Sequence, residues 1–329
     1  DMIGLGHMAI ADPEWVNKVR RNETYDIRPC IGCNECLYAG FSGKILHCAV
    51  NPLAFAEDYY PVTPGDPNKR VLVVGGGPGG LVAAITAAER GMQVDLWEKK
   101  NELGGLLLAA GGPKFKKDVK DYVDYLVGKV YRSNINLSLM KEATPENVLA
   151  GGYDKVIVAT GANPVMPPIK GIDEDFVVGA NDVLTNKASY GKNVVVIGGG
   201  LVGCETACHV AERADNVTII EMLPEILMNC DHSRNNDQAL RALMEECEVN
   251  SITDANCVAF KDNTVVYQVN GEEKTIEADT VAIAAGYRSS TSLYDEISDK
   301  VDCQIIGDAV KPDKILTAVH QGFNSVRCI

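Results

Sequence analysis

The chain has 329 residues, 46% of them hydrophobic, which is enough for two domains with filled cores. Its 45 acidic and 31 basic residues give a net charge of −14, which disfavours nucleic acid or an anionic membrane surface as a partner. The sequence contains neither an apolar run of membrane-spanning length nor a secretory signal pattern, so we expect a cytoplasmic location.

The first 22 residues predict a strand at Met2–Gly6, followed by a short helix that opens at Asp12-Pro13. The strand-like run follows directly after Asp1, and no Met begins the chain. We therefore expect that further protein precedes Asp1, with a natural processed N-terminus as the alternative.

Residues 23–66 are rich in Cys, Gly and Pro and lack a helical or strand period, so we predict an irregular segment. It contains the motif Cys30-x2-Cys33-x2-Cys36-x11-Cys48. Thiolates at this spacing can ligate one 4Fe–4S cluster. Structural zinc is the first alternative, although zinc sites usually pair their cysteines as two separate knuckles. Unligated thiols are the second alternative.

From Lys69 the sequence predicts a strand at Val71–Val74, a helix at Leu81–Arg90 and a strand at Val94–Trp97, which is the start of a βαβ unit. The turn after the first strand reads Gly75-x-Gly77-x-x-Gly80. In such a turn the first glycine allows the bend, the second allows close approach of a pyrophosphate, and the third allows helix–strand packing. Glu98 follows the second strand, at a position where a carboxylate can accept a hydrogen bond from a ribose hydroxyl.

The same pattern recurs at a strand spanning Asn193–Ile197, which is followed by Gly198-x-Gly200-x-x-Gly203 and, at the end of the next strand, by Glu221. An acidic residue at that position disfavours a 2′-phosphate, so the second unit is expected to prefer NADH over NADPH. The two units are an internal repetition of architecture. Farther along, Asn270-Gly271 between two strand-like runs predicts a hairpin.

The remaining cysteines are scattered. Cys204 and Cys208 lie four residues apart on the predicted helix after Gly203, and we interpret them as buried packing residues rather than a redox pair. Cys230, Cys247, Cys257, Cys303 and Cys328 are interpreted as structural.

Together with the segments Tyr153–Gly161 and Val301–Ala309, the two glycine motifs make residues 67–329 resemble the two-dinucleotide-binding flavoproteins of the pyridine nucleotide–disulfide reductase fold. The resemblance implies that the first unit binds FAD and the second NAD(H), and that Asp308 contacts the flavin ribityl chain. The implied FAD-binding residues are Gly75, Gly77, Gly79, Gly80, Glu98, Gly104, Gly105, Ala159, Thr160, Gly161, Gly307 and Asp308. The implied NAD-binding residues are Gly198, Gly200, Gly203, Glu221 and Gly286.

The N-terminal part narrows the resemblance. Residues 1–13 look like the last strand and helix of an old yellow enzyme barrel, and the cysteine motif follows directly. This order resembles the group of 2,4-dienoyl-CoA reductase, 2-enoate reductase and trimethylamine dehydrogenase, which join an FMN-binding (β/α)8 barrel to a 4Fe–4S segment and an FAD/NAD(P) module. That group usually has Arg near the FMN phosphate where this chain has His7. An FMN contact by His7 is one interpretation, and a loop histidine without function in this chain is the other.

We therefore predict an α/β protein with two Rossmann-like domains. The expected domains are the end of the barrel at 1–22, the cluster segment at 23–66, the FAD domain at 67–180 and 289–329, and the NAD(H) domain at 181–288. As an enzyme of that group, the protein would pass electrons from NADH through FAD and the cluster to FMN in the missing barrel, which would reduce an activated carbon–carbon double bond. An amine dehydrogenase of the same architecture and a non-catalytic electron-transfer module are the alternatives, and a homo-oligomer is left open.

Overall fold

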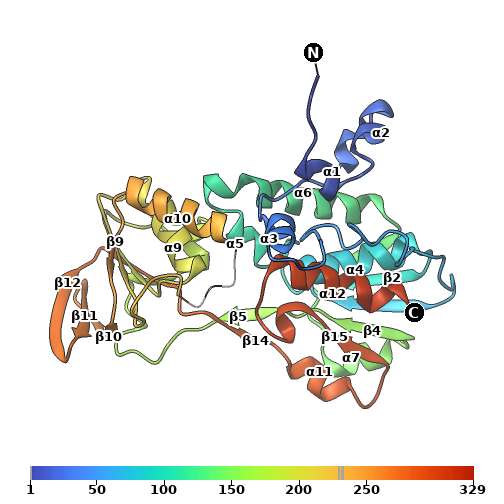
Figure 1. Ribbon diagram of the computed structural model, residues 1–329. Helices are drawn as coiled ribbons and strands as arrows, with labels where there is room; N and C mark the ends of the chain where they lie inside the picture. Colours follow the sequence, from blue (N-terminus) through green and yellow to red (C-terminus); the bar gives the residue numbers. More distant parts are fainter. Residues whose placement is uncertain (1, 229, 231–232) are drawn as a thin grey trace. The chain divides into compact units, whose positions relative to one another are not determined.

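Each of the two glycine motifs follows an interior strand of a parallel sheet, and each sheet belongs to a separate unit of the chain (Figure 1). Unit 1 runs from the N-terminus to Leu108 and also contains residues 118–163 and 288–329, and unit 2 contains residues 109–117 and 164–287. The computed structural model describes residues 2–228, 230 and 233–329. The predicted fold class, an α/β protein with two Rossmann-like folds, is confirmed.

The sheet of unit 1 has the strand order β15-β4-β1-β2-β3, and all its pairs are parallel. Its strands are β1 (Arg70–Val74), β2 (Gln93–Trp97), β3 (Ile135–Ser138), β4 (Lys155–Val158) and β15 (Cys303–Ile305). The helices that follow Val74 in this unit are α4 (Pro78–Glu89), α6 (Lys117–Arg132), α7 (Pro145–Ala150), α11 (Ser292–Ile297) and α12 (Ile315–Arg327), with a 3-10 turn η3 (Gly307–Ala309). After their first residues, Arg70 and Lys155, the strands β1 and β4 are apolar, because both faces of the sheet are covered.

The sheet of unit 2 repeats this plan with the order β6-β13-β7-β8-β9, again entirely parallel. Its strands are β6 (Val177–Gly179), β7 (Asn193–Ile197), β8 (Asn216–Ile220), β9 (Asn250–Ile252) and β13 (Thr280–Ile283). The helices are α8 (Ala180–Leu184), α9 (Leu201–Ala211) and α10 (Arg234–Glu246), with a 3-10 turn η2 (Lys114–Lys116). The short helix α5 (Leu107–Ala110) and the two-stranded ribbon of β5 (Ala162–Pro164) and β14 (Tyr287–Ser289) lie where the chain passes between the units.

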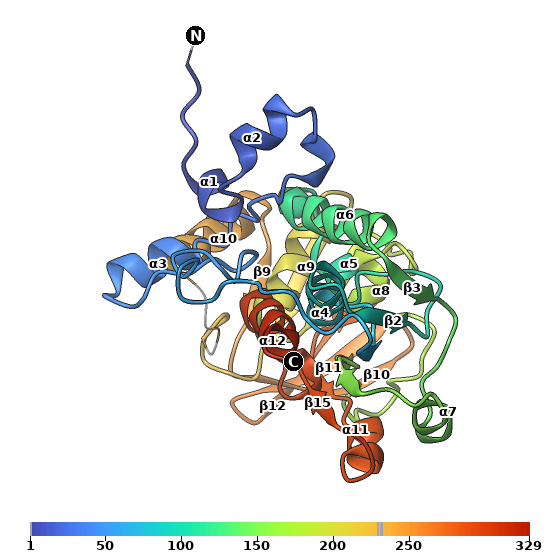
Figure 2. The ribbon, with the colours of Figure 1, turned by 90° about the vertical axis from the view of Figure 1, so that its right-hand side faces the viewer.

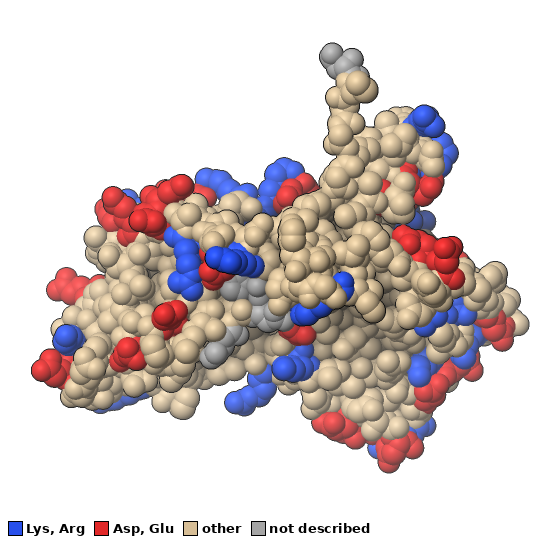
Figure 3. All heavy atoms as spheres, in the orientation of Figure 1, with Lys and Arg blue, Asp and Glu red and all other residues tan. Residues whose placement is uncertain are grey.

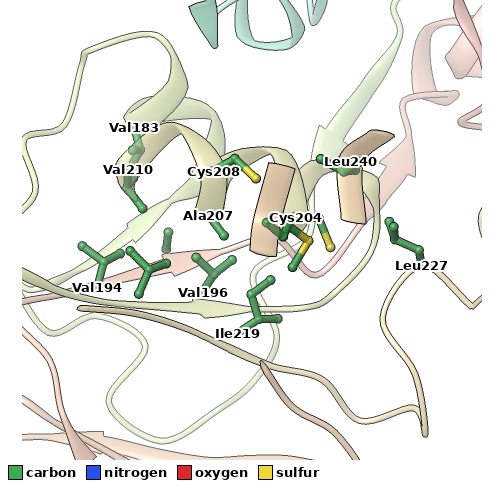
Figure 4. Close-up of a cluster of buried hydrophobic side chains, with 13 residues drawn as sticks. Val183, Val194, Val196, Cys204, Ala207, Cys208, Val210, Ile219, Leu227 and Leu240 are labelled. Carbon is green, nitrogen blue, oxygen red and sulfur yellow. The ribbon is translucent and has the colours of Figure 1, made fainter. Parts of the chain in front are cut away.

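Alternate residues of β7 point to two different cores. Val194 and Val196 pack on α9 with Cys204 and Cys208, as Figure 4 shows, whereas Val195 faces the other side of the sheet. That second core is closed by an antiparallel sheet of β10 (Ala255–Lys261), β11 (Thr264–Val269) and β12 (Glu272–Glu277). Because side chains alternate along a strand with a period of two, successive valines of β7 enter opposite cores.

The predicted hairpin is confirmed. Strands β11 and β12 pair from Val269 opposite Glu272, so Asn270 and Gly271 form a two-residue connection. Both have positive φ, +53° for Asn270 and +82° for Gly271, as a type I′ turn requires.

Two predictions for the N-terminal 66 residues are wrong. No strand forms at Met2–Gly6 in the described part of the chain, because the backbone there has no neighbouring strand with which to pair. Instead α1 (His7–Ala11) begins directly, and the predicted helix after Pro13 is α2 (Trp15–Arg20). The segment 23–66 is not wholly irregular, since it contains a 3-10 turn η1 (Thr24–Asp26) and helix α3 (Glu35–Phe41), in which Ala39 is buried. Asp1 lies outside the described residues.

Candidate cofactor sites

The turn between β1 and α4 has the conformation that the glycine motif predicts. Gly75 has φ = +109°, and a Cβ built on it would lie 2.3 Å from the Ala159 carbonyl oxygen. A Cβ on Gly80 would lie 1.9 Å from the Gly75 carbonyl oxygen. Both positions therefore require glycine for the fold itself, as the helix–strand packing in a βαβ unit demands.

Gly77 differs from its two neighbours in the motif. Its φ is −79°, which any residue can adopt, and a Cβ built on it would meet no atom within 4 Å. The fold does not require glycine at this position. The open space in front of the Gly77 backbone lies at the first turn of α4, where helix N–H groups favour a phosphate.

Glu98 is 8% exposed, and its carboxylate stabilises the glycine turn by hydrogen bonds. Its Oε2 accepts a hydrogen bond from the Gly76 N–H at 2.7 Å, and its Oε1 accepts from the Lys100 N–H at 2.8 Å. Each carboxylate oxygen retains a further lone pair. The predicted contact with a ribose hydroxyl stays a prediction.

The second glycine motif repeats this geometry in unit 2. Gly198 has φ = +106°, and a Cβ on Gly203 would lie 1.8 Å from the Gly198 carbonyl oxygen. Gly200 has φ = −74°, and a Cβ on it would again meet no atom within 4 Å. The Glu221 carboxylate, also 8% exposed, accepts from the Gly199 N–H and, at 2.8 Å, from the Leu223 N–H.

Other predicted residues meet at the turn of unit 1. Gly104 donates its N–H to the Gly76 carbonyl at 2.8 Å, and a Cβ on Gly105 would lie 2.9 Å from the Gly77 Cα. Ala159 continues β4, and its N–H donates to the Val74 carbonyl at 2.8 Å.

Thr160 and Gly161 contact the segment after β14. The Thr160 hydroxyl donates to the Ser290 carbonyl at 2.6 Å, and the Ser290 N–H donates to the Gly161 carbonyl at 3.0 Å. The predicted strand end at Thr160-Gly161 is thereby tied to the returning chain.

Gly307 and Asp308 form the turn η3 before α12. The Asp308 Oδ1 accepts from the Asp313 N–H at 3.2 Å, and burial raises the pKa of the Asp308 carboxyl. The predicted contact of Asp308 with the flavin is untested. Gly79 lies at the contact between α4 and α12, where a Cβ on it would lie 3.1 Å from the Ala318 carbonyl oxygen, so its role in the fold is helix packing.

In unit 2 Gly286 was expected from the sequence to bind NAD, whereas its neighbours Ala284 and Ala285 were not. Ala284 donates its N–H to the Ile197 carbonyl at 2.8 Å, and the Ala284 carbonyl is 2.5 Å from a Cβ built on Gly198. Ala284-Ala285-Gly286 therefore stands where Ala159-Thr160-Gly161 stands in unit 1. The similarity of VIVATG and VAIAAG, both at strand ends, is a signal that identifies the pair.

The four N-terminal cysteines lie together. Cys30, Cys33, Cys36 and Cys48 line one small cavity, with His7, Ile10, Ile31, Asn34, Ala49 and Val50 forming the rest of its wall. Among the described residues, no three His, Cys, Asp or Glu side chains are placed to hold a single metal ion. The loop bends at Gly32, which has φ = +64°.

The thiols in this cavity are poor acids when no cation is present. Burial raises the pKa of the Cys33 thiol to about 12, and it also raises the pKa of Cys30 and Cys48. Backbone N–H groups nevertheless point at the sulfurs, with Gly32 donating to Cys30 at 3.5 Å and Glu35 donating to Cys33. Such thiolates need a bound cation, which an iron–sulfur cluster would supply. The donor set, the shared cavity and these N–H groups fit that group.

His7 lies at the start of α1 and lines the cysteine cavity, which the sequence did not indicate. Its predicted FMN contact is untested.

Cys204 and Cys208 are 0% and 2% exposed and belong to the core beneath α9, which confirms the interpretation as packing residues (Figure 4). Across the described residues, no helix is both long and apolar enough to cross a membrane.

Comparison with known proteins identifies relatives of the part of the chain that contains both glycine turns. The model of the pyridine nucleotide-disulphide oxidoreductase family matches residues 69–319. The NADH oxidase of Thermoanaerobacter brockii is 39% identical over 334 residues, which cover 98% of this chain and 51% of that protein. The cinnamate reductase of Clostridium sporogenes is 36% identical over 332 residues, which cover 100% of this chain and 50% of that protein. A solved 2-naphthoyl-CoA reductase complex superposes with a TM-score of 0.91 at 32% identity, covering 98% of this chain and 49% of that one.

The chain belongs to the pyridine nucleotide-disulphide oxidoreductase family. It is an NAD(P)H-dependent flavoprotein oxidoreductase module whose fold binds FAD and NAD(P)H. The predicted resemblance to the enoate reductase group is confirmed by these relatives. The chain spans about half the length of the curated relatives it matches.

Proposed function

We propose that this chain is the electron-input module of a larger iron–sulfur flavoprotein. In this proposal unit 1 binds FAD, unit 2 binds NADH, and Cys30, Cys33, Cys36 and Cys48 ligate a 4Fe–4S cluster. The whole protein would reduce an activated carbon–carbon double bond at an FMN barrel that precedes this chain. The names of two similar proteins, cinnamate reductase and 2-naphthoyl-CoA reductase, support that substrate class.

The observation that carries the proposal is the open space at Gly77 and Gly200. Neither glycine has a positive φ, and in neither case would a Cβ meet a protein atom within 4 Å. Glycine at these two positions is therefore explained by a ligand, because a pyrophosphate must approach the backbone closely at this point of the motif. The same open space beside the backbone in both units supports one dinucleotide site in each unit.

The protein's own part in the reaction is to bind and orient. The N-terminal turns of α4 and α9 would direct backbone N–H groups toward the phosphates, and Glu98 and Glu221 fix the conformation of each turn. When bound, FAD would take a hydride from NADH and release electrons singly to the cluster. Orientation of the two dinucleotides suffices for the hydride step, so no side chain of this chain needs to act as acid or base.

An amine dehydrogenase of the same architecture would pass electrons outward and would not need NADH. The second turn keeps the open space at Gly200 and the buried carboxylate of Glu221, which favours an NADH site in use. A bare electron-transfer module would likewise not need this site.

Alanine substitution at the two open glycines tests the proposal. Gly77→Ala should abolish FAD retention, whereas Gly200→Ala should retain FAD and weaken NADH binding by roughly tenfold or more, about 1.4 kcal/mol. Gly4→Ala is the matched control, because a Cβ on Gly4 also meets no atom within 4 Å. Bound flavin is measured by absorbance, and NADH binding by the rate of flavin bleaching under anaerobic conditions. Unchanged binding in both loop variants contradicts the proposal.

A further inference from the structure

The C-terminal helix α12 contacts both predicted redox sites of unit 1. One side of α12 packs on α4, where a Cβ built on Gly322 would lie 2.2 Å from the Gly79 carbonyl oxygen. Gln321 of the same helix accepts from the Gly307 N–H at 2.6 Å, directly before Asp308. Figures 1 and 2 show α12 alongside α4 in both views. The helix is therefore fixed to the segments that would hold FAD.

Two other side chains of this region reach the cysteine segment. Lys314, the N-cap residue of α12, forms an ion pair with Glu35 at 3.0 Å between Nζ and Oε1. His320, which lies farther along α12, has its Nε2 2.8 Å from the Cys48 carbonyl oxygen. Since a carbonyl only accepts, this nitrogen of His320 carries the proton.

Glu35 is an unusual residue for its position. It lies between two cluster cysteines in sequence, it is 7% exposed, and its own N–H donates to the Cys33 sulfur. A buried carboxylate requires a charged partner. Lys314 is that partner, and His47 approaches the other oxygen of Glu35 at 3.8 Å.

We propose, resting on the function proposed above, that Lys314 and His320 are positioning residues for the cluster. Through Glu35 and the Cys48 carbonyl they hold the cysteine loop on the helix that also supports the flavin-binding turn. Lys314 in addition neutralises the Glu35 charge beside Cys33, and this favours the reduced cluster, which carries one more negative charge than the oxidised cluster.

The test uses the full-length protein purified anaerobically with FAD and iron. Lys314→Met should lower the midpoint potential of the cluster, measured by a redox titration followed by electron paramagnetic resonance. The expected shift is about tenfold in the one-electron equilibrium, or about 59 mV. Lys314→Arg keeps the charge and should retain the wild-type potential. Lys311→Met, on the exposed segment before α12, is the matched control and should have no effect.

A second pair of variants tests His320. His320→Leu removes the donor to Cys48 and should slow reduction of the cluster by reduced flavin by roughly tenfold, equivalent to about 1.4 kcal/mol in the barrier. His320→Gln keeps a donor and should restore the rate. The rate at which NADH bleaches the flavin should be the same in all variants, because the contacts proposed for the two residues are with Glu35 and the Cys48 carbonyl of the cysteine segment.

If Lys314→Met loses its iron, the double variant Lys314→Met/Glu35→Gln removes both charges. Recovery of iron in the double variant or in Lys314→Arg supports the proposal. The proposal is overturned if Lys314→Met has the same cluster potential as Lys311→Met and His320→Leu has the same rate of cluster reduction as Lys311→Met. Absence of iron from the wild-type protein, or of flavin bleaching by NADH, is a different outcome and rejects the proposed function itself.

Discussion

Cys204 and Cys208 show how burial decides the chemistry of a thiol. Both side chains lie in the core between α9 and the sheet of unit 2, and burial raises the pKa of each to about 12. At pH 8 the reactive thiolate would be about one part in ten thousand of each residue. Although the family name refers to disulphides, this pair is a packing element of the core.

Alkylation of the native protein tests that interpretation. Iodoacetamide at pH 8 should modify the exposed Cys328 at least about a hundredfold faster than Cys204 or Cys208, because thiolate fraction and access both limit the reaction. Peptide mass spectrometry after timed quenching measures the three rates. Equal labelling of Cys204 and Cys328 in folded protein contradicts a core position for Cys204.

Glu221 carries a prediction on coenzyme preference. Its carboxylate holds the Gly199 and Leu223 N–H groups and, in the proposed site, repels a 2′-phosphate. Glu221→Gln removes the charge while keeping an acceptor, so the preference for NADH over NADPH should fall by roughly tenfold, about 1.4 kcal/mol. The ratio of kcat/KM for the two coenzymes with an artificial electron acceptor gives the answer. Glu98→Gln, the corresponding change in unit 1, is the control and should leave the coenzyme preference unchanged. An unchanged preference in Glu221→Gln would count against a role of Glu221 in selecting NADH.

At the scale of the element, each glycine turn contains glycines that the fold requires for steric reasons and another that only a bound ligand would require. Gly203→Ala would place a Cβ 1.8 Å from the Gly198 carbonyl oxygen, whereas Gly200→Ala meets nothing. The first variant should lower the free energy of unfolding by about 1–3 kcal/mol through overpacking. The second should change it by less than about 0.5 kcal/mol.

Urea unfolding of the two variants without added dinucleotide measures this difference. Both substitutions add one methyl group to the same turn, so each is the control of the other. Equal losses of stability would mean that the close contact between Gly203 and Gly198 is absent in solution.

Elements with a strong local pattern were predictable from the sequence. The Asn270-Gly271 hairpin, the apolar strands β1 and β7 and the glycine turns follow from residues that are adjacent in the chain. Helix α3 was not predictable, because its seven residues include one Gly and one Cys, which weaken a helical pattern. Packing of the buried Ala39 stabilises the helix. The Met2–Gly6 strand failed for the opposite reason, since an apolar run forms a strand only beside a partner.

Contacts between distant residues were also beyond the sequence. Lys314 and His320 reach Glu35 and Cys48, which are 279 and 272 residues away in the chain. No motif links them, because only the folded unit 1 brings α12 to the cysteine segment. The spacing of the four cysteines, in contrast, did predict that they lie together.

At the scale of the whole molecule, two units of one plan combine with an N-terminal cysteine segment. Acidic and basic side chains are interspersed on the face drawn in Figure 3, and the described residues on that face form no basic stripe. Each unit has its own core and its own glycine turn, so each is equipped for one dinucleotide. The matched relatives are about twice as long, and the proposed FMN barrel would account for the difference.

The most direct measurement is anaerobic addition of NADH to the purified full-length protein, with flavin absorbance and electron paramagnetic resonance recorded on the same sample. We expect about four iron atoms per chain, bleaching of the flavin, and then the signal of a reduced 4Fe–4S cluster. A protein with bound flavin that NADH does not bleach, or one whose four N-terminal cysteines hold no iron, would contradict it.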